Sequence, residues 1–162
     1  MLPASDLRGP PFHASFAVHT RDEAAELAAR LGAFFPDPGR AVLGLQELLF
    51  NAVEHGNLAI GTERKAALLR AGTFEAEIEA RLADPSYRDR QVSVELDVRG
   101  GEVQVTISDE GCGFDSTAAL ARELEASAAP NGRGISLTRA AAFPSLTYRG
   151  CGNIAVVTVR WP

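Results

Sequence analysis

The 162-residue sequence contains little lysine, little cysteine and no long apolar run. Lys65 is the only lysine, and because no glycine-rich loop precedes it, the lysine of a P-loop nucleotide site is missing. Cys112 and Cys151 are the only cysteines, and each lies between two glycines, a spacing that indicates neither a zinc site nor a disulfide framework. We therefore interpret both as ordinary loop residues.

Membrane and targeting signals are also lacking. No apolar stretch is long enough to span a bilayer, and the first residues have neither the basic flank nor the apolar run of a signal peptide. Basic residues are outnumbered, with 16 Lys and Arg against 21 Asp and Glu and a net charge of -5. This balance offers no basic surface to nucleic acid or to an anionic membrane. We expect a cytoplasmic protein whose partner is a small molecule or another protein.

The composition and the residue pattern together predict one globular domain over residues 1–162. Its 46% hydrophobic residues are enough for a core. The predicted strands are 12–18, 92–98, 103–107, 146–149 and 154–159, and the predicted helices are 20–35, 38–56, two stretches within 62–83, and 135–142. We predict an α/β (α+β) two-layer sandwich with a mixed, mostly antiparallel sheet that helices cover on one face.

The polar half of the second predicted helix carries Glu47, Asn51, Glu54 and His55, opposite a stripe of leucines. Glu47 and Asn51 are four residues apart, so their side chains project next to each other. A carboxylate and an amide oxygen in this arrangement could hold a hydrated divalent cation such as Mg²⁺, or orient a water. Taken alone, the pair is more typical of the solvated face of an amphipathic helix.

A glycine loop, Asp109-x-Gly111-x-Gly113, directly follows the strand predicted at 103–107. An aspartate at a strand end can accept a hydrogen bond from an exocyclic amine, and the glycines permit positive φ and let the backbone pass close to a planar base. The same residues could equally form an ordinary turn.

A second glycine loop, Gly132-Arg133-Gly134, precedes the helix predicted at 135–142. The free N–H groups and the positive dipole end of a helix start favour an anion there. A helix that opens with two such glycines is common, so this signal is weak by itself.

Taken in order, the helix with Glu47, Asn51 and His55 and the two glycine loops resemble the N-box, G1 box and G2 box of the GHKL ATPase superfamily, which includes gyrase and the histidine kinases. The resemblance covers roughly residues 12–160. The run at 47–57, the short chain and the absence of a dimerisation helix with a phosphoacceptor histidine are similar to the anti-sigma-factor serine kinase branch. The resemblance implies a Bergerat-type ATP-binding fold, ATP and Mg²⁺ as cofactors, and a homodimer as one arrangement.

The resemblance also implies a role for each motif residue. Glu47 would be the general base, Asn51 the Mg²⁺ ligand and Asp109 the acceptor for the adenine amine. Gly111 and Gly113 would shape the adenine pocket. The second glycine loop would close over the phosphates with Gly132, Arg133 and Gly134. Residues 115–131 would form an ATP lid, and Thr158 is a candidate for the threonine that the family places near adenine.

The implied function is that of a protein serine/threonine kinase. It would transfer the ATP γ-phosphate to a Ser or Thr of an antagonist protein of the anti-anti-sigma type, with sequestration of a sigma factor as a further role. Two alternatives stay open: a non-catalytic, nucleotide-dependent protein-binding module, and a stand-alone histidine-kinase ATP domain. The helical segment at about 58–90 is longer than a compact family member needs, so we expect it to reshape the partner surface or lie beside the lid.

Overall fold

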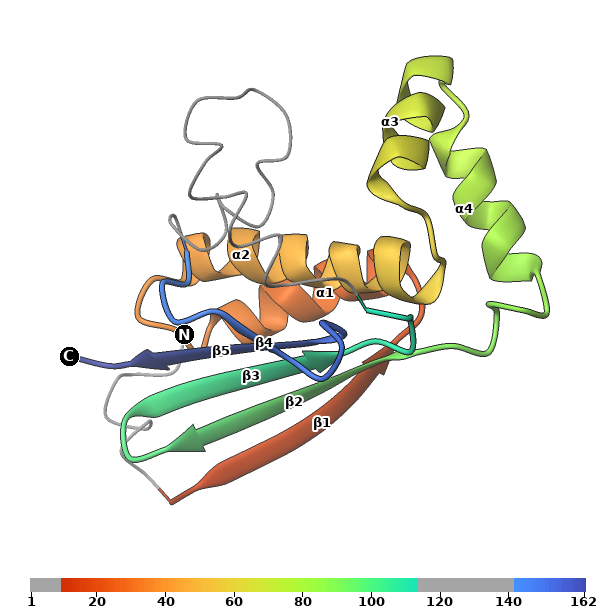
Figure 1. The fold of residues 1–162 in the computed structure, drawn as a ribbon. Helices are drawn as coiled ribbons and strands as arrows, with labels where there is room; N and C mark the ends of the chain where they lie inside the picture. The colour runs from red at the N-terminus through yellow and green to blue at the C-terminus, as the bar shows by residue number, and fades with distance from the viewer. Residues whose placement is uncertain (1–9, 114–141) are drawn as a thin grey trace.

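The computed structural model describes residues 10–113 and 142–162, which form two layers, a β-sheet and a pair of helices packed on one of its faces (Figure 1). The remaining residues are drawn there as a thin grey trace. Among the described residues, no helix combines the length and the apolar character that crossing a membrane requires.

The sheet has five strands in the order β1-β2-β3-β5-β4. Their bounds are Phe12–Val18 for β1, Val92–Arg99 for β2, Glu102–Ser108 for β3, Thr147–Arg149 for β4 and Ile154–Arg160 for β5. Every described pair of neighbours is antiparallel. The prediction of a mixed sheet is therefore wrong for these strands. Tight turns join β2 to β3 and β4 to β5, and each such turn reverses the chain between neighbouring strands.

The apolar face of the sheet follows from strict alternation along the strands. Val94 and Leu96 are completely buried, whereas Ser93 and Glu95, the residues that precede each of them, are exposed. The register pairs Leu96 with Val105 on the neighbouring strand, so both strands turn the same face to the core.

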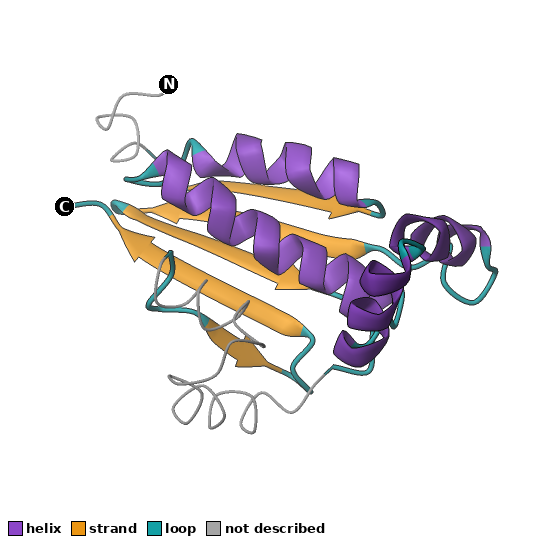
Figure 2. Cartoon of the chain, turned by 90° about the horizontal axis from the view of Figure 1, so that it is seen from above, coloured by secondary structure: helices purple, strands orange, loops and turns teal. Residues whose placement is uncertain are grey.

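Two helices cover this apolar face (Figure 2), α1 (Arg21–Gly32) and α2 (Pro38–Asn51). Thr20 and Glu23 form a capping box at the start of α1, where the sequence predicts a helix to begin. The helices pack so closely that a Cβ built on Gly32 would lie 2.4 Å from the Val42 side chain. The polar half of α2 is thereby fixed in orientation relative to the sheet.

A π-helix, η2 (Ala52–Asn57), continues α2, whereas the sequence predicts a regular helix to Gly56. The wider turn changes which side chains face inward. Glu54, predicted on the polar face, is buried with 1% exposure. Its burial depends on two cations from other elements, described below, which the helical period cannot show.

The segment at 58–90 contains two short helices that stand beyond the end of the sheet, next to the C-terminal end of α2 (Figure 1). They are α3 (Thr62–Ala71) and α4 (Phe74–Ala83), the two stretches predicted within 62–83, and Gly72, in the left-handed conformation at φ +70°, separates them. The hairpin therefore lies on the same side of the molecule as the end of η2.

Candidate functional site

The end of η2 and the loop after β3 meet at two glycines. We call residues 109–113 the Asp109 loop. A Cβ built on Gly56 would lie 2.3 Å from Asp109 Cγ, and one built on Gly111 would lie 2.5 Å from the Gly56 carbonyl oxygen. Neither position has room for a side chain. Two of the three predicted motifs, which lie far apart in the sequence, thus touch in the fold.

The backbone of Asp109 is held by Asn153, a residue of the turn at 150–153 that we call the Cys151 turn. The Asp109 N–H donates to the Asn153 carbonyl oxygen at 3.0 Å, and Asn153 Nδ2 donates to the Asp109 carbonyl oxygen at 3.1 Å. Sequence reasoning did not identify Asn153, because it is separated from Asp109 by more than forty residues. Its only sequence signal is the turn that precedes the last strand.

The Asp109 carboxylate lies in a half-buried environment at the end of β3. Burial raises the pKa of this carboxyl group, and the hydrogen bond that the Gly111 N–H donates to Oδ1 at 2.8 Å acts in the opposite direction. No Arg, Lys or His among residues 10–113 and 142–162 forms an ion pair with it. A desolvated carboxylate without a cation is suited to accept a hydrogen bond from a ligand N–H group.

Asn57 is a second residue that the sequence reasoning missed. Its side chain is 2% exposed, and Oδ1 accepts a hydrogen bond from the Glu110 N–H at 2.8 Å. The Glu110 carboxylate in turn accepts one from the Gln91 N–H at 2.6 Å. Asn57 therefore fastens the Asp109 loop to the end of η2. Its buried Nδ2 has no hydrogen-bond partner in the described structure.

Glu47 and Asn51 are half-buried on α2, and their side chains form no hydrogen bond or ion pair with another described residue. Both carry oxygen atoms that no described residue engages. Mg²⁺ prefers oxygen ligands and usually takes few from the protein, with water and substrate phosphates supplying the rest. Asn51, with Glu47 one turn away, fits a Mg²⁺ ion that is held in this way. Among the described residues no group of three or more His, Cys, Asp or Glu forms a dedicated metal site.

Three further predicted features have different outcomes. Gly113 has the positive φ expected of it, +72°. His55 Nδ1 is hydrogen-bonded to the Ile60 carbonyl oxygen, so this ring tethers the end of the helix. Thr158 pairs with Gln104 on the face of the sheet opposite the helices, where its backbone bonds Ser145, and so it is not beside Asp109.

The third motif, Gly132-Arg133-Gly134, and the predicted lid at 115–131 lie outside the described residues. The described chain resumes with Ala142 and Phe143. Phe143 is buried against Gly44 of α2, where a Cβ would lie 2.5 Å from its ring. Phe143 therefore packs against the middle of the helix that carries Glu47 and Asn51.

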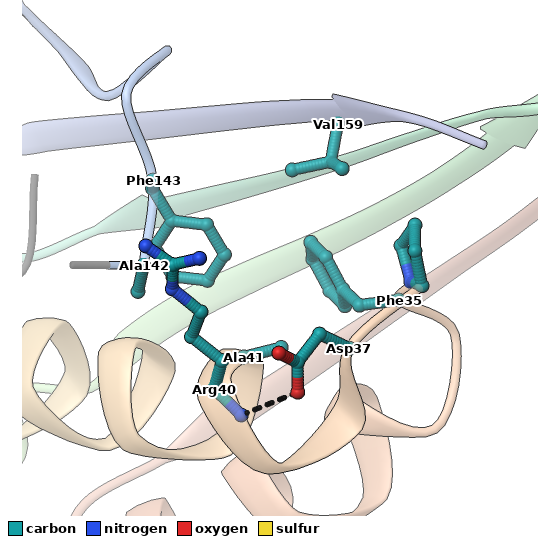
Figure 3. A pocket seen from close by; sticks show the side chains of 8 residues that line it. Phe35, Asp37, Arg40, Ala41, Ala142, Phe143 and Val159 are labelled. Carbon is teal, nitrogen blue, oxygen red and sulfur yellow. Dashed lines mark hydrogen bonds between the residues drawn. The ribbon is translucent and has the colours of Figure 1, made fainter. Parts of the chain in front are cut away.

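A shallow hollow at the N-terminal end of α2 is a different place (Figure 3). Aromatic and aliphatic side chains line it, with Asp37 and Arg40 as its charged residues. Asp37 caps the helix there by accepting a hydrogen bond from the Arg40 N–H at 3.1 Å. A 14-residue helix is about 20 Å long. The hollow is thus one helix length from Asp109 and is not part of the candidate site.

The α3–α4 hairpin is attached to η2 through buried charge. Glu54 lies 2.5 Å from Lys65 Nζ of α3 and 3.1 Å from Arg21 Nε of α1, and Arg21 also bonds Glu75 of α4 at 2.7 Å. Arg21 stacks on Phe74 as well, 5.5 Å from the ring centre. These contacts neutralise the Glu54 carboxylate and fix η2 against α1 and the hairpin.

Two arginines reinforce this attachment. Arg81 donates to the Leu58 carbonyl oxygen, and Arg90 Nη1 donates to the Asn57 carbonyl oxygen at 3.1 Å. Asn57 is the last residue of η2 and Leu58 directly follows it, a place where backbone oxygens lose their helical partners. The segment at 58–90 therefore supplies cations that hold the turn behind Asp109.

No protein-family model matches the chain, and no curated protein is significantly similar to it.

Proposed function

We propose that this protein binds ATP with Mg²⁺ between the Asp109 loop and the polar side of α2, in a Bergerat-type fold. It would transfer the γ-phosphate to a Ser or Thr of an antagonist protein of the anti-anti-sigma type, and sequester a sigma factor as the regulated partner. The observation that carries the proposal is the close approach of Gly56 to the desolvated Asp109 carboxylate, which accepts a hydrogen bond from the Gly111 N–H and forms no ion pair with a described residue. A helix motif and a loop motif that belong to one ATP site by resemblance are adjacent here.

The positions of the remaining residues support an extended ligand. Asn51 precedes Gly56 by five residues, about 7 Å along a helix. The adenine of ATP at Asp109 and the phosphates near Asn51 would therefore lie along one side of the same helix. The antiparallel sheet with helices on one face is compatible with this arrangement.

The transfer step requires positioning and charge neutralisation more than covalent help from the protein. The hydroxyl oxygen of the partner's Ser or Thr would form a bond to the γ-phosphorus, and Glu47 would accept the hydroxyl proton. The bond between the γ-phosphorus and the β–γ bridging oxygen would break at the same time, and ADP would leave. Asn51 would hold Mg²⁺, which neutralises charge on the phosphates when bound. No nucleophile is needed from this chain.

The test has two measurements. Calorimetric titration with ATP and ADP, each with and without Mg²⁺, is expected to show binding that Mg²⁺ strengthens for ATP. Transfer of labelled phosphate to a purified antagonist protein is expected for wild type and for Glu26→Ala, an exposed glutamate of α1 that serves as the control. It is expected to be lost in Glu47→Ala.

Each other outcome contradicts a defined part of the proposal. Absence of ATP binding would refute the site itself. ATP binding with no more transfer by wild type than by Glu47→Ala would refute the kinase activity and leave a nucleotide-dependent binding module. Label found on histidine of the partner would identify a histidine-kinase ATP domain.

A further inference from the structure

The two cysteines of the chain, separate in sequence, belong to neighbouring loops. Cys112 is in the Asp109 loop and Cys151 in the Cys151 turn, and both are exposed with free thiols. A Cβ built on Gly113 would lie 2.1 Å from the Cys151 carbonyl oxygen and 2.7 Å from Cys151 Sγ. The residue next to Cys112 therefore lies directly against Cys151.

The backbone on both sides permits the small movement that would join the two sulfurs. Consecutive Cα atoms are about 3.8 Å apart, and a disulfide needs its Cα atoms within about 4.4–6.8 Å. Gly113, Gly150 and Gly152 have φ values of +72°, +65° and +95°. Glycine populates these conformations and their neighbours without strain. A change confined to the two turns is thus sufficient in principle to bring the thiols together.

We propose that Cys112 and Cys151 form a reversible intramolecular disulfide that clamps the Asp109 loop to the Cys151 turn and weakens nucleotide binding. Formation of the bond is independent of the proposed function. Its effect on the nucleotide rests on that function.

The reaction balances with a peroxide as the oxidant. One thiolate attacks a peroxide oxygen, forms a sulfenic acid and releases hydroxide. The second thiol then displaces the sulfenic oxygen as water and forms the S–S bond. Two thiols lose two protons and two electrons, and hydrogen peroxide becomes two waters. Glutathione disulfide reaches the same product through a mixed disulfide, with two glutathione thiols released.

The disulfide would act on the site through Asn153. Cys151 Sγ–H donates to Asn153 Oδ1 at 3.4 Å, and Asn153 holds the Asp109 backbone at two points. Oxidation removes this donor and pulls on Gly113. Gly111 cannot yield in compensation, because it already lies against the Gly56 carbonyl oxygen. The Asp109 carboxylate is therefore expected to move away from its position in the reduced protein.

The first arm of the test measures the bond itself. The full-length protein is treated with glutathione disulfide, remaining thiols are blocked by alkylation, and intact mass and non-reduced peptides are recorded. We expect a monomer without alkylation, lighter than the reduced protein by about 2 Da, with Cys112 and Cys151 in one linked peptide pair that dithiothreitol separates. Cys112→Ser and Cys151→Ser are each expected to yield only a glutathione adduct or a dimer. Disulfide-linked dimers of wild type, or two thiols that stay alkylatable, would overturn the pairing.

The second arm compares the ATP affinity of reduced and oxidised protein by calorimetry. We expect oxidation to weaken ATP binding by about tenfold, with recovery on reduction and no effect in the double Cys→Ser variant. By reciprocity, ATP with Mg²⁺ should disfavour the disulfide to the same extent. Equal affinity of the two forms would refute the regulatory effect. A reduced protein that does not bind ATP would refute the proposed function, and the first arm would still decide whether the bond forms.

Discussion

Replacement of Asp109 by asparagine separates the contribution of this carboxylate to ATP binding from its effect on folding stability. The change keeps the size of the side chain and an oxygen that accepts from the Gly111 N–H, but it removes the charge. A lost charge-assisted hydrogen bond with a mispaired partner costs about 1–3 kcal/mol. We therefore expect the dissociation constant for ATP to rise by roughly 5- to 150-fold.

The same substitution should leave folding stability unimpaired. Burial raises the pKa of Asp109, which means that the fold disfavours the charged form. The amide side chain of the Asp109→Asn variant would have no charge to desolvate, so the free energy of unfolding at neutral pH should stay level or increase. Calorimetry with ATP and urea unfolding at pH 7 measure the two effects. A substitution that damaged the fold would instead lower both the ATP affinity and the free energy of unfolding.

The pH dependence provides a further check of this reasoning. Because the folded pKa lies above the ordinary value of 3.8, the folded state takes up the Asp109 proton before the unfolded state does as pH falls. At neutral pH the buried charge of Asp109 lowers the free energy of unfolding. As pH falls through the folded pKa this penalty disappears, so wild type gains stability relative to Asp109→Asn. ATP affinity should fall over the same interval in wild type only.

The matched control is Asp97→Asn, on the sheet face opposite the helices, where Asp97 pairs with His13 and Arg99. It should not change ATP affinity. Unchanged affinity in Asp109→Asn would refute the adenine assignment, and a marked loss of stability in that variant would refute the electrostatic account of Asp109.

Two other substitutions test the support of the site. Gly56→Ala would place a Cβ 2.3 Å from Asp109 Cγ, so we expect a loss of about 1–3 kcal/mol in urea unfolding together with weaker ATP binding, whereas Gly61→Ala, with open space around its Cβ, should have neither effect. Glu54→Gln would leave two cations of α1 and α3 without their buried carboxylate, and we expect a loss of about 3 kcal/mol, near the lower end of the range for a broken buried pair because both cations are partly solvated. A urea midpoint equal to that of wild type would contradict the role of Glu54.

The parts of the fold that depend on local pattern were predictable. Alternation placed β2 and β3 because a strand with one buried face has a period of two, and the register Val94 to Ile107 follows from that face. The start of α2 was predictable because Asp37 accepts a hydrogen bond from a free N–H of the first turn and Pro38 has a backbone angle that suits this turn. These signals act within a few residues, so one sequence is enough to reveal them.

The parts that depend on distant partners were not predictable. Glu54 looked like a surface residue because its helical position is polar, yet it is buried since Arg21 and Lys65 reach it from other elements. The side chains of Asn57 and Asn153 hold the Asp109 loop through hydrogen bonds to its backbone, and nothing in their sequence surroundings indicates which loop they contact. The motif order suggested which segments share a site, whereas tertiary contacts decide how that site is held.

The segment at 58–90 shows why this distinction matters for function. From the sequence we expected it to reshape the partner surface or lie beside the lid. In the structure Lys65 pairs with Glu54, and Arg90 bonds the carbonyl oxygen of Asn57, whose side chain fastens the Asp109 loop. Removal of Lys65 would leave the buried Glu54 carboxylate with Arg21 alone, and removal of Arg90 would take a donor from the Asn57 carbonyl oxygen, so the cost of either change falls on the turn behind the candidate site. The hairpin is therefore a structural part of that site, and any partner that displaced it would change the position of Asp109.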